Sequence, residues 1–314
     1  MSVAAHEVEV FERARARLEA IAYRLLGSAT DAEDAVQDTF LRWQSADRAR
    51  VETPEAWLTK VLTNVCLNRL TSARARRETY VGQWLPEPVF AGDPMLGPSE
   101  TVEQRESVSI AMLTLMERLS AKERVVYVLR EAFGYSHGEI AEVLDLTEPN
   151  CQQIYRRAKQ HLAAGRRRVA VDAAAAREIV QEFLAAALSG KTDSLIRMLT
   201  DDAISVGDGG GVVFSVPQPI TGALRVARFL RTLFTPTEAK WEMIGGRPDL
   251  FAAVANGVPA LVMVVGDRVV GVFSLDVTAD GIAAVHAQAN PGKLDRATRR
   301  WAVSEHGEPL PGDW

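Results

Sequence analysis

A helix–turn–helix pattern between Ser136 and Leu162 constrains the fold of this chain more than any other sequence feature. Apolar residues recur at helical spacing on both sides of the turn at 145–147, and Ala141 is small enough for a second helix to cross closely. The inward positions are Ile140, Ala141, Val143 and Leu144 in the first helix, and Cys151, Ile154, Tyr155, Ala158 and Leu162 in the second. Asp145 occupies a turn position often held by glycine, and aspartate tolerates a left-handed backbone better than most residues.

The outward face of the second predicted helix is polar and cationic, which is typical of a helix that enters the DNA major groove. Amides and guanidinium groups pair with purine edges, whereas other cations suit phosphates. The predicted DNA-binding residues of this helix are Asn150, Gln152, Gln153, Arg156, Arg157 and Lys159. We expect Arg157 and Arg166 to Arg168 to contact phosphates. The alternative is an ordinary antiparallel helix pair whose polar face meets only solvent.

Upstream of this motif, residues from Val10 to about Ala75 follow a helical pattern and predict a compact all-helical domain. Thr30 precedes an acidic first turn and is the expected N-cap of a second helix. A third helix should begin at Thr53-Pro54-Glu55 and bury Trp57 and the apolar residues that follow it. The segment 78–107 is interrupted by proline and glycine and predicts an acidic linker. Its apolar residues, Trp84, Leu85, Val89 and Phe90, are costly to leave in water, so we expect a surface that receives them.

The chain changes character near Val171, where helices are followed by strand-like runs, an α+β layout. The expected strands are Ala203 to Val206, Val212 to Val216, Ala260 to Val265, Arg268 to Val277 and Ile282 to Ala289, in a mostly antiparallel sheet. The fold class is therefore multidomain, with two all-α domains followed by an α+β domain. The predicted boundaries are 8–77, 78–107, 108–168, 171–295 and a C-terminal tail at 296–314.

Composition excludes several classes of protein. The chain has 314 residues, of which 47% are hydrophobic and 25% charged, with a net charge of −5, as in ordinary globular proteins. No apolar run reaches the roughly 18 residues of a membrane span, and the N-terminus is acidic where a signal peptide would be basic. We therefore expect a soluble, cytoplasmic protein. Cys66 and Cys151 both lie in apolar helical patterns, so neither a disulfide framework nor a thiolate metal site is expected, and we predict no metal and no cofactor.

These motifs together resemble the extracytoplasmic-function (ECF) sigma factors. Residues 31–40 (DAEDAVQDTF), 54–58 (PEAWL) and 64–69 (NVCLNR) resemble their region 2, and residues 119–124 (LSAKER) leading into the helix–turn–helix resemble region 4. The part after Val171 resembles the cone-shaped, SnoaL-like domain fused to one subgroup. That subgroup carries WLPEP in the linker, DGGG followed by a basic residue, and NPDKL. Here WLPEP is intact, DGGG is followed by Val212, and NPGKL replaces NPDKL, so a charge of each sign is lost.

The resemblance implies a sigma factor that directs promoter-specific transcription initiation. Asp31, Asp34 and Asp38 share one helix face and would bind a coiled coil on the β′ clamp of core RNA polymerase, while region 4 would bind the β flap. The third helix, which we expect to expose Thr59 and Thr63, would hold the unstacked strand of the downstream promoter element together with the loop from Gln44 to Thr53. Its implied DNA-binding residues are Lys60, Asn64, Asn68 and Arg69. The helix–turn–helix would read the upstream element as duplex DNA.

The C-terminal domain is open to a regulatory or a catalytic interpretation. Catalysis like that of SnoaL-like cyclases and ketosteroid isomerases needs a base and an oxyanion donor, and the candidates are few: Asp201, Asp202, Asp208 and His286. We therefore assign no catalytic residue and favour regulation through contacts between this domain and the linker. The predicted regulatory residues are Trp84, Leu85, Pro86, Glu87, Pro88, Asp208, Gly209, Gly210, Gly211, Asn290, Pro291, Lys293 and Leu294.

Further hypotheses concern a ligand of the C-terminal domain and alternative functions of the whole protein. A small apolar ligand inside the cone would change the regulation if it bound two arrangements of the protein differently. The main alternative to a sigma factor is a free-standing helix–turn–helix regulator with a ligand-sensing domain, and a less favoured one is isomerase or cyclase activity. A sigma factor should co-purify with core polymerase, whereas a free-standing regulator need not.

Overall fold

The computed structural model describes residues 3–47, 50–78, 80–162 and 172–311. The chain divides into two compact units. The first, which we call the helical unit, comprises residues 1–79, 92–108 and 112–165; the second, the α+β unit, comprises residues 80–91, 109–111 and 166–314. The predicted linker is therefore shared between the units. Its first half belongs with the C-terminal residues and its second half with the helices.

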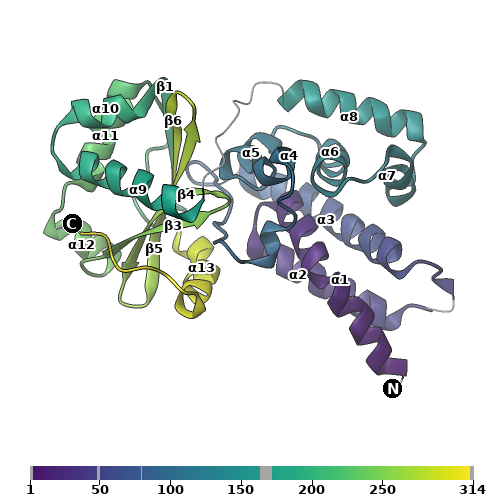
Figure 1. Cartoon of the computed structure of the whole chain (residues 1–314). Coiled ribbons are helices and arrows are strands. Elements are labelled where there is room, and N and C mark those ends of the chain that lie inside the picture. The colour runs from purple at the N-terminus through teal and green to yellow at the C-terminus, as the bar shows by residue number, and fades with distance from the viewer. Residues whose placement is uncertain (1–2, 48–49, 79, 163–171, 312–314) are drawn as a thin grey trace. The chain divides into compact units, whose positions relative to one another are not determined.

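The N-terminal part of the helical unit is a bundle of α1 (Val3–Leu26), α2 (Ala29–Ser45) and α3 (Pro54–Glu78) (Figure 1). Helix α2 begins earlier than expected because Ser28, rather than Thr30, is its N-cap, and the Ser28 hydroxyl accepts a hydrogen bond from the backbone N–H of Asp31. Trp57 packs on Trp43, with ring centroids 5.4 Å apart, and is half-buried. The predicted helical domain is confirmed.

The rest of the helical unit contains the predicted helix–turn–helix. The short helices α4 (Val102–Glu106) and α5 (Ile110–Met116) precede α6 (Ala121–Phe133), α7 (His137–Leu144) and α8 (Glu148–Leu162). Asp145 ends α7 in the left-handed conformation expected for it, with φ of 53°. Cys151, Ile154, Ala158 and Leu162 of α8 are buried as predicted, and Tyr155 is half-buried.

A buried arginine holds the second half of the linker on α1. The Arg24 side chain is 0% exposed, and it donates hydrogen bonds to the Ser107 hydroxyl (2.8 Å) and to the backbone carbonyl of Leu96 (2.6 Å). Gly97 has φ of 62°, and a Cβ there would lie 2.7 Å from Ala20 Cβ. The linker backbone therefore passes α1 at a distance that only glycine permits. This contact was not predicted, because an arginine in a helical pattern ordinarily faces water.

The α+β unit is built on a six-stranded sheet with strand order β2-β1-β6-β5-β4-β3. The strands are β1 (Leu199–Asp208), β2 (Ile220–Thr221), β3 (Asp249–Ala255), β4 (Val258–Val265), β5 (Arg268–Thr278) and β6 (Gly281–Gln288). The helices are α9 (Ala173–Leu188), α10 (Thr192–Met198), α11 (Ala223–Phe234), α12 (Glu238–Ile244) and α13 (Pro291–Val303). Strand β1 pairs with β6 in parallel and the other pairs are antiparallel, so the sheet is mixed.

Both faces of this sheet are covered, which explains why β4 is an almost continuous run of buried residues. Leu261 and Met263 contribute to a core with α9 and α11, whereas Val262 and Val264 contribute to a core with α13 on the opposite face (Figure 1). The second core also contains Phe90 from the linker. The α+β architecture predicted from the sequence is confirmed.

The structure of this unit differs from the sequence-based expectations in several places, and one predicted strand was wrong. The expected strand Val212 to Val216 is an irregular segment, because it follows a glycine turn and precedes two prolines that cannot donate ladder hydrogen bonds. Strand β3 and helix α12 were not predicted; the alanines of β3 have low strand propensity. Helix α13 continues through the expected boundary at residue 295 as far as Val303, because Trp301 is buried against Phe90 and Phe251.

Candidate nucleic-acid interface and linker clasp

Helix α8 presents the polar face expected of a DNA-reading helix. Asn150, Gln153, Arg156, Arg157 and Lys159 are exposed, and Gln152 is half-buried, with its amide donating to the Glu148 carboxylate at 3.3 Å. The opposite face of α8 is apolar and buried against the rest of the unit. Burial also raises the pKa of the Cys151 thiol, so this cysteine is a core residue and not a thiolate nucleophile. Arg166 to Arg168 lie outside the described residues.

The second predicted DNA-binding face, on α3, is only partly open. Asn64 and Asn68 are exposed, but the Lys60 ammonium forms an ion pair with Asp145 Oδ1 at 2.5 Å and donates to the Glu142 carbonyl at 3.0 Å. Thr59 and Thr63 were expected on the exposed face and are buried, a wrong prediction. The reason is that α3 packs against α6 and α7. The predicted loop Gln44 to Thr53 includes residues 48 and 49, which lie outside the described residues.

Arg69 lies among the acidic residues of α2. Its guanidinium is 2.7 Å from Asp38, 3.7 Å from Asp34 and 3.8 Å from Asp31. These carboxylates share one helix face, as the sequence predicts, and their side chains remain 31% to 58% exposed. Arg69 was grouped with the DNA-binding residues from the sequence, and in the structure its side chain neutralises part of the acidic face.

In the α+β unit, the carboxylate of Asp208 holds the first half of the linker. Asp208 is 1% exposed. Its Oδ1 accepts hydrogen bonds from the Tyr80 hydroxyl (2.6 Å) and the Gly210 backbone N–H (3.0 Å). Its Oδ2 accepts from the Leu85 backbone N–H (2.9 Å) and forms an ion pair with the Lys293 ammonium (2.7 Å). We call Asp208, Tyr80, Leu85 and Lys293 the linker clasp.

The residues around the linker clasp complete the attachment. Asn290 Nδ2 donates to the Tyr80 hydroxyl at 2.7 Å, and Gln288 Nε2 donates to the carbonyls of Leu85 and Pro86, each at 3.2 Å. The Lys293 ammonium donates to the Leu85 carbonyl and lies 4.3 Å from the Trp84 ring centroid. The segments 84–88, 208–211 and 290–294 picked out from the sequence are thus brought together. Tyr80 and Gln288 were not predicted, because single polar residues carry no spacing signal.

A second attachment lies a few residues further along the linker, at the edge strand β3. The Val89 N–H donates to Asn256 Oδ1 at 3.0 Å, the Asn256 N–H donates to the Val89 carbonyl at 2.8 Å, and the Ala91 N–H donates to the Val254 carbonyl at 3.0 Å. Phe90 forms an antiparallel bridge with Ala255 and packs on Trp301. The linker therefore extends the sheet at its edge. This explains how the apolar linker residues leave water, as the sequence led us to expect.

Burial and the adjacent Asp208 carboxylate raise the pKa of the Tyr80 hydroxyl. A tyrosine that stays protonated is a reliable hydrogen-bond donor to a carboxylate. The linker clasp therefore contains one buried negative charge, on Asp208, balanced by one cation, Lys293, and by neutral donors. Such an arrangement satisfies each oxygen of a buried carboxylate.

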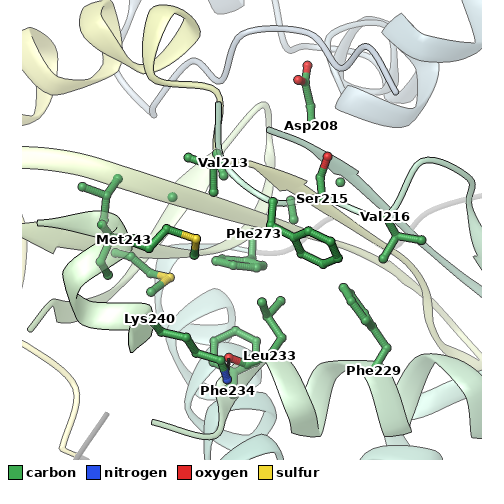
Figure 2. A pocket seen from close by; sticks show the side chains of 18 of the residues that line it. Asp208, Val213, Ser215, Val216, Phe229, Leu233, Phe234, Lys240, Met243 and Phe273 are labelled. Atoms are coloured by element: carbon green, nitrogen blue, oxygen red, sulfur yellow. Dashed lines mark hydrogen bonds between the residues drawn. The ribbon is translucent and has the colours of Figure 1, made fainter. Parts of the chain in front are cut away.

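The candidates for catalysis are not gathered in one place. Asp201 and Asp202 are exposed on β1, His286 is buried on β6, and Asp208 belongs to the linker clasp. Asp208 is the one of these four that lines a cavity of about 370 Å³ between the sheet and helices α11 and α12 (Figure 2). Within the described part of the chain, no group of three or more potential metal ligands is present. No described helix is long and apolar enough to cross a membrane.

Comparison with known proteins identifies the modules. The family model for sigma-70 region 2 matches residues 10–76, and the model for sigma-70 region 4 matches residues 109–162. The ECF RNA polymerase sigma factor SigJ of Mycobacterium tuberculosis is 37% identical over 225 residues, which cover 71% of this chain and 72% of SigJ. The probable ECF sigma factor SigI of the same species is 30% identical over 289 residues, covering 90% and 92% of the two chains.

A solved structure is similar over nearly the full length. The crystal structure of M. tuberculosis SigJ aligns with a TM-score of 0.69 and 30% sequence identity, covering 91% of this chain and 97% of that one. Relatives of this length and identity favour the sigma factor prediction over a free-standing regulator or an isomerase. The chain belongs to the ECF family of RNA polymerase sigma factors, which bind core polymerase and promoter DNA to direct transcription initiation and are not enzymes.

Proposed function

We propose that the C-terminal α+β unit modulates this sigma factor by holding the linker between region 2 and region 4. The observation that carries the proposal is the linker clasp, in which Asp208 takes hydrogen bonds from both Tyr80 and Leu85. Segment 80–91 lies between the two DNA-reading regions in the chain. A linker that is docked on the sheet of the α+β unit cannot extend. Whether the linker is docked or released therefore governs the largest distance that can separate region 2 from region 4.

The expected consequence concerns promoter spacing. A free chain spans at most about 3.3–3.6 Å per residue, so releasing segment 80–91 lengthens the reach between the regions considerably. With the linker held, we expect a narrow range of accepted distances between the downstream and upstream promoter elements. With the linker released, the range should broaden. A flexible linker gives region 4 a similar effective concentration at the upstream element over a range of distances between the two promoter elements.

We also propose roles for the predicted contact residues. Region 4 reads duplex DNA with Asn150, Gln152, Gln153, Arg156 and Lys159, while Arg157 contacts phosphate. Region 2 holds the downstream element with Lys60, Asn64 and Asn68. Asp31, Asp34 and Asp38 bind the β′ clamp, and region 4 also binds the β flap. Since Arg69 is within ion-pair distance of these carboxylates, we propose that it orients the acidic face, in addition to any contact with DNA.

In vitro transcription on a promoter series tests the proposal about the linker. Each promoter carries the same two elements separated by a different spacer, and each reaction contains core polymerase and the full chain. Lys293→Met removes the ion pair and the cation over Trp84, and Lys191→Met makes the same change at an exposed position of the same unit. Lys293→Met, and truncation after residue 170, should broaden the accepted spacers. Identical spacer profiles for the Lys293→Met, Lys191→Met and unaltered chains would reject the proposed mechanism.

A further inference from the structure

We infer that the cavity of the α+β unit binds a neutral, largely apolar small molecule, and that the loop 209–217 couples its occupancy to the linker. The second half of this inference rests on the proposed function of the linker, whereas the first does not. Figure 2 shows the cavity enclosed by Phe229, Leu233 and Phe234 on one side and by Phe273 and Val213 on the other. A volume of about 370 Å³ is in the range of ligand sites in proteins.

The composition of the cavity wall sets the chemistry of its occupant. Of the side chains lining the cavity within the described residues, only Ser205, Asp208, Ser215 and Lys240 are polar. The rest are apolar, including phenylalanines and the methionines Met243 and Met263, which adapt to irregular shapes. An apolar molecule with aromatic or alicyclic rings therefore matches most of the wall.

The two charged side chains in the wall are already occupied, which is why the occupant should be neutral. Asp208 receives the linker clasp donors, and Lys240 donates to the carbonyls of Thr232 (2.5 Å), Thr235 (2.6 Å) and Leu233 (3.2 Å) near the end of α11. An ionic ligand would enter without a counterion and would lose its hydration. A serine hydroxyl in the wall, such as that of Ser205, can instead bond one hydroxyl or carbonyl group of a neutral ligand.

The loop 209–217 touches the cavity with one set of residues and the linker with another. Val213, Phe214, Ser215 and Val216 line the cavity. In the same loop, the Pro217 carbonyl accepts a hydrogen bond from Gln83 Nε2 at 2.8 Å, and Gly211 lies so close to Val81 that a Cβ at Gly211 would be 3.2 Å away from it. A change in the loop therefore reaches the linker through direct contacts.

The cavity entrance gives the direction of this coupling. Phe214 is 79% exposed and Met243 50% exposed, although both line the cavity. An apolar occupant would cover part of these side chains and favour the loop position observed, in which the loop contacts the linker. Occupancy should therefore strengthen linker docking, and an empty cavity should weaken it.

The test uses N-phenyl-1-naphthylamine, a neutral apolar dye whose fluorescence rises in apolar surroundings, with the full chain. Ala239→Trp places an indole at an exposed position that lines the cavity, and Ala279→Trp makes the same substitution at an exposed turn outside it. Ala287→Phe fills the cavity from β6 and serves if Ala239→Trp does not fold. Linker docking is measured in the same samples as hydrogen exchange of the amides in segment 80–91.

We expect saturable binding to the unaltered chain and to Ala279→Trp, and binding weaker by roughly tenfold or more in the cavity-filling variants. At saturation the dye should slow exchange of the linker amides in the unaltered chain. No binding, or equal binding in the filled variants, overturns the site. Binding without slower linker exchange overturns the coupling. If both results are as expected while promoter spacing is unaffected by Lys293→Met, the ligand site and its effect on linker docking stand, whereas the proposed function of the linker, and with it the regulatory meaning of the coupling, fails.

Discussion

Replacing Asp208 by Asn should release the linker from the α+β unit while leaving the shape of the linker clasp almost unchanged. An asparagine has one oxygen where the carboxylate has two, and its NH₂ group is a donor. If the oxygen takes the place of Oδ2, the NH₂ group faces the Gly210 N–H and the Tyr80 hydroxyl. If it takes the place of Oδ1, the NH₂ group faces the Leu85 N–H and the Lys293 ammonium. In either orientation the NH₂ group of the asparagine, itself a donor, faces groups that also donate, so hydrogen bonds of the linker clasp are lost.

The magnitude follows from the burial of the pair. Removing one partner of a buried ion pair costs about 3–5 kcal/mol. The loss is reduced here because the Lys293 ammonium keeps the Leu85 carbonyl at 2.8 Å and the rings of Tyr80 and Trp84. We therefore expect the lower end, about 3 kcal/mol, which corresponds to an opening equilibrium roughly 100-fold more favourable.

Hydrogen exchange of individual amides measures this directly. The Leu85 amide donates to Asp208 itself and the Val89 amide donates to Asn256, so both should exchange roughly 100-fold faster in Asp208→Asn if the linker opens as a unit. Asp201→Asn, the same change at an exposed position of β1, is the control. Acceleration of Leu85 alone would mean that the two attachments open independently. Exchange equal to that of the control at both amides would refute the reasoning from charge burial.

Three further predictions test other parts of the structure. The pKa of Tyr80 is raised from its usual value of 10, so linker docking should be constant below about pH 10 and weaken as the pH rises further. The thermal midpoint should therefore fall more between about pH 9 and about pH 11 in the unaltered chain than in Tyr80→Phe. Gly97→Ala should destabilise the helical unit by about 1–3 kcal/mol more than Gly92→Ala in thermal unfolding, since both have positive φ but only Gly97 has a neighbour within 3 Å of the added Cβ; equal losses would contradict this. Arg156→Gln should reduce the free energy of binding to the promoter that the sigma factor recognises by about 1–3 kcal/mol. Arg157→Gln should weaken binding to all DNA sequences and lower the slope of log K against log salt concentration by about 1, with both measured by fluorescence anisotropy of the holoenzyme.

Features that depend on local periodicity were predictable from the sequence. The helix–turn–helix follows from apolar residues at helical spacing, and even the left-handed conformation of Asp145 could be anticipated from its side chain. The α+β character of the C-terminal part follows from its β-branched runs. The linker clasp was located because its motifs resemble those of related chains, not because of their spacing.

Features that depend on partners distant in the chain were not predictable. Strand β3 contains three alanines, which have low strand propensity, and it becomes a strand because β4 pairs with it. Helix α13 begins at Pro291 and continues beyond the expected boundary at residue 295, because Trp301 near its end packs on Phe90 and Phe251. The segment 212–216 has the composition of a strand, but it finds no neighbouring strand and lines a cavity instead. Thr59 and Thr63 are buried by α6 and α7, which lie far from them in the sequence.

The bridge between Phe90 and Ala255 has a consequence for how long the released form of this protein can persist. Strand β3 is the last strand of the sheet, and the linker backbone occupies hydrogen-bonding groups near its end. When the linker leaves, that part of the edge and the side of Trp301 that Phe90 covers meet water together, and bare edges of this kind invite pairing with other chains. Undocking of the linker in the absence of polymerase would thus favour aggregation. We therefore expect the undocked form to persist only when the sigma factor is bound to core polymerase.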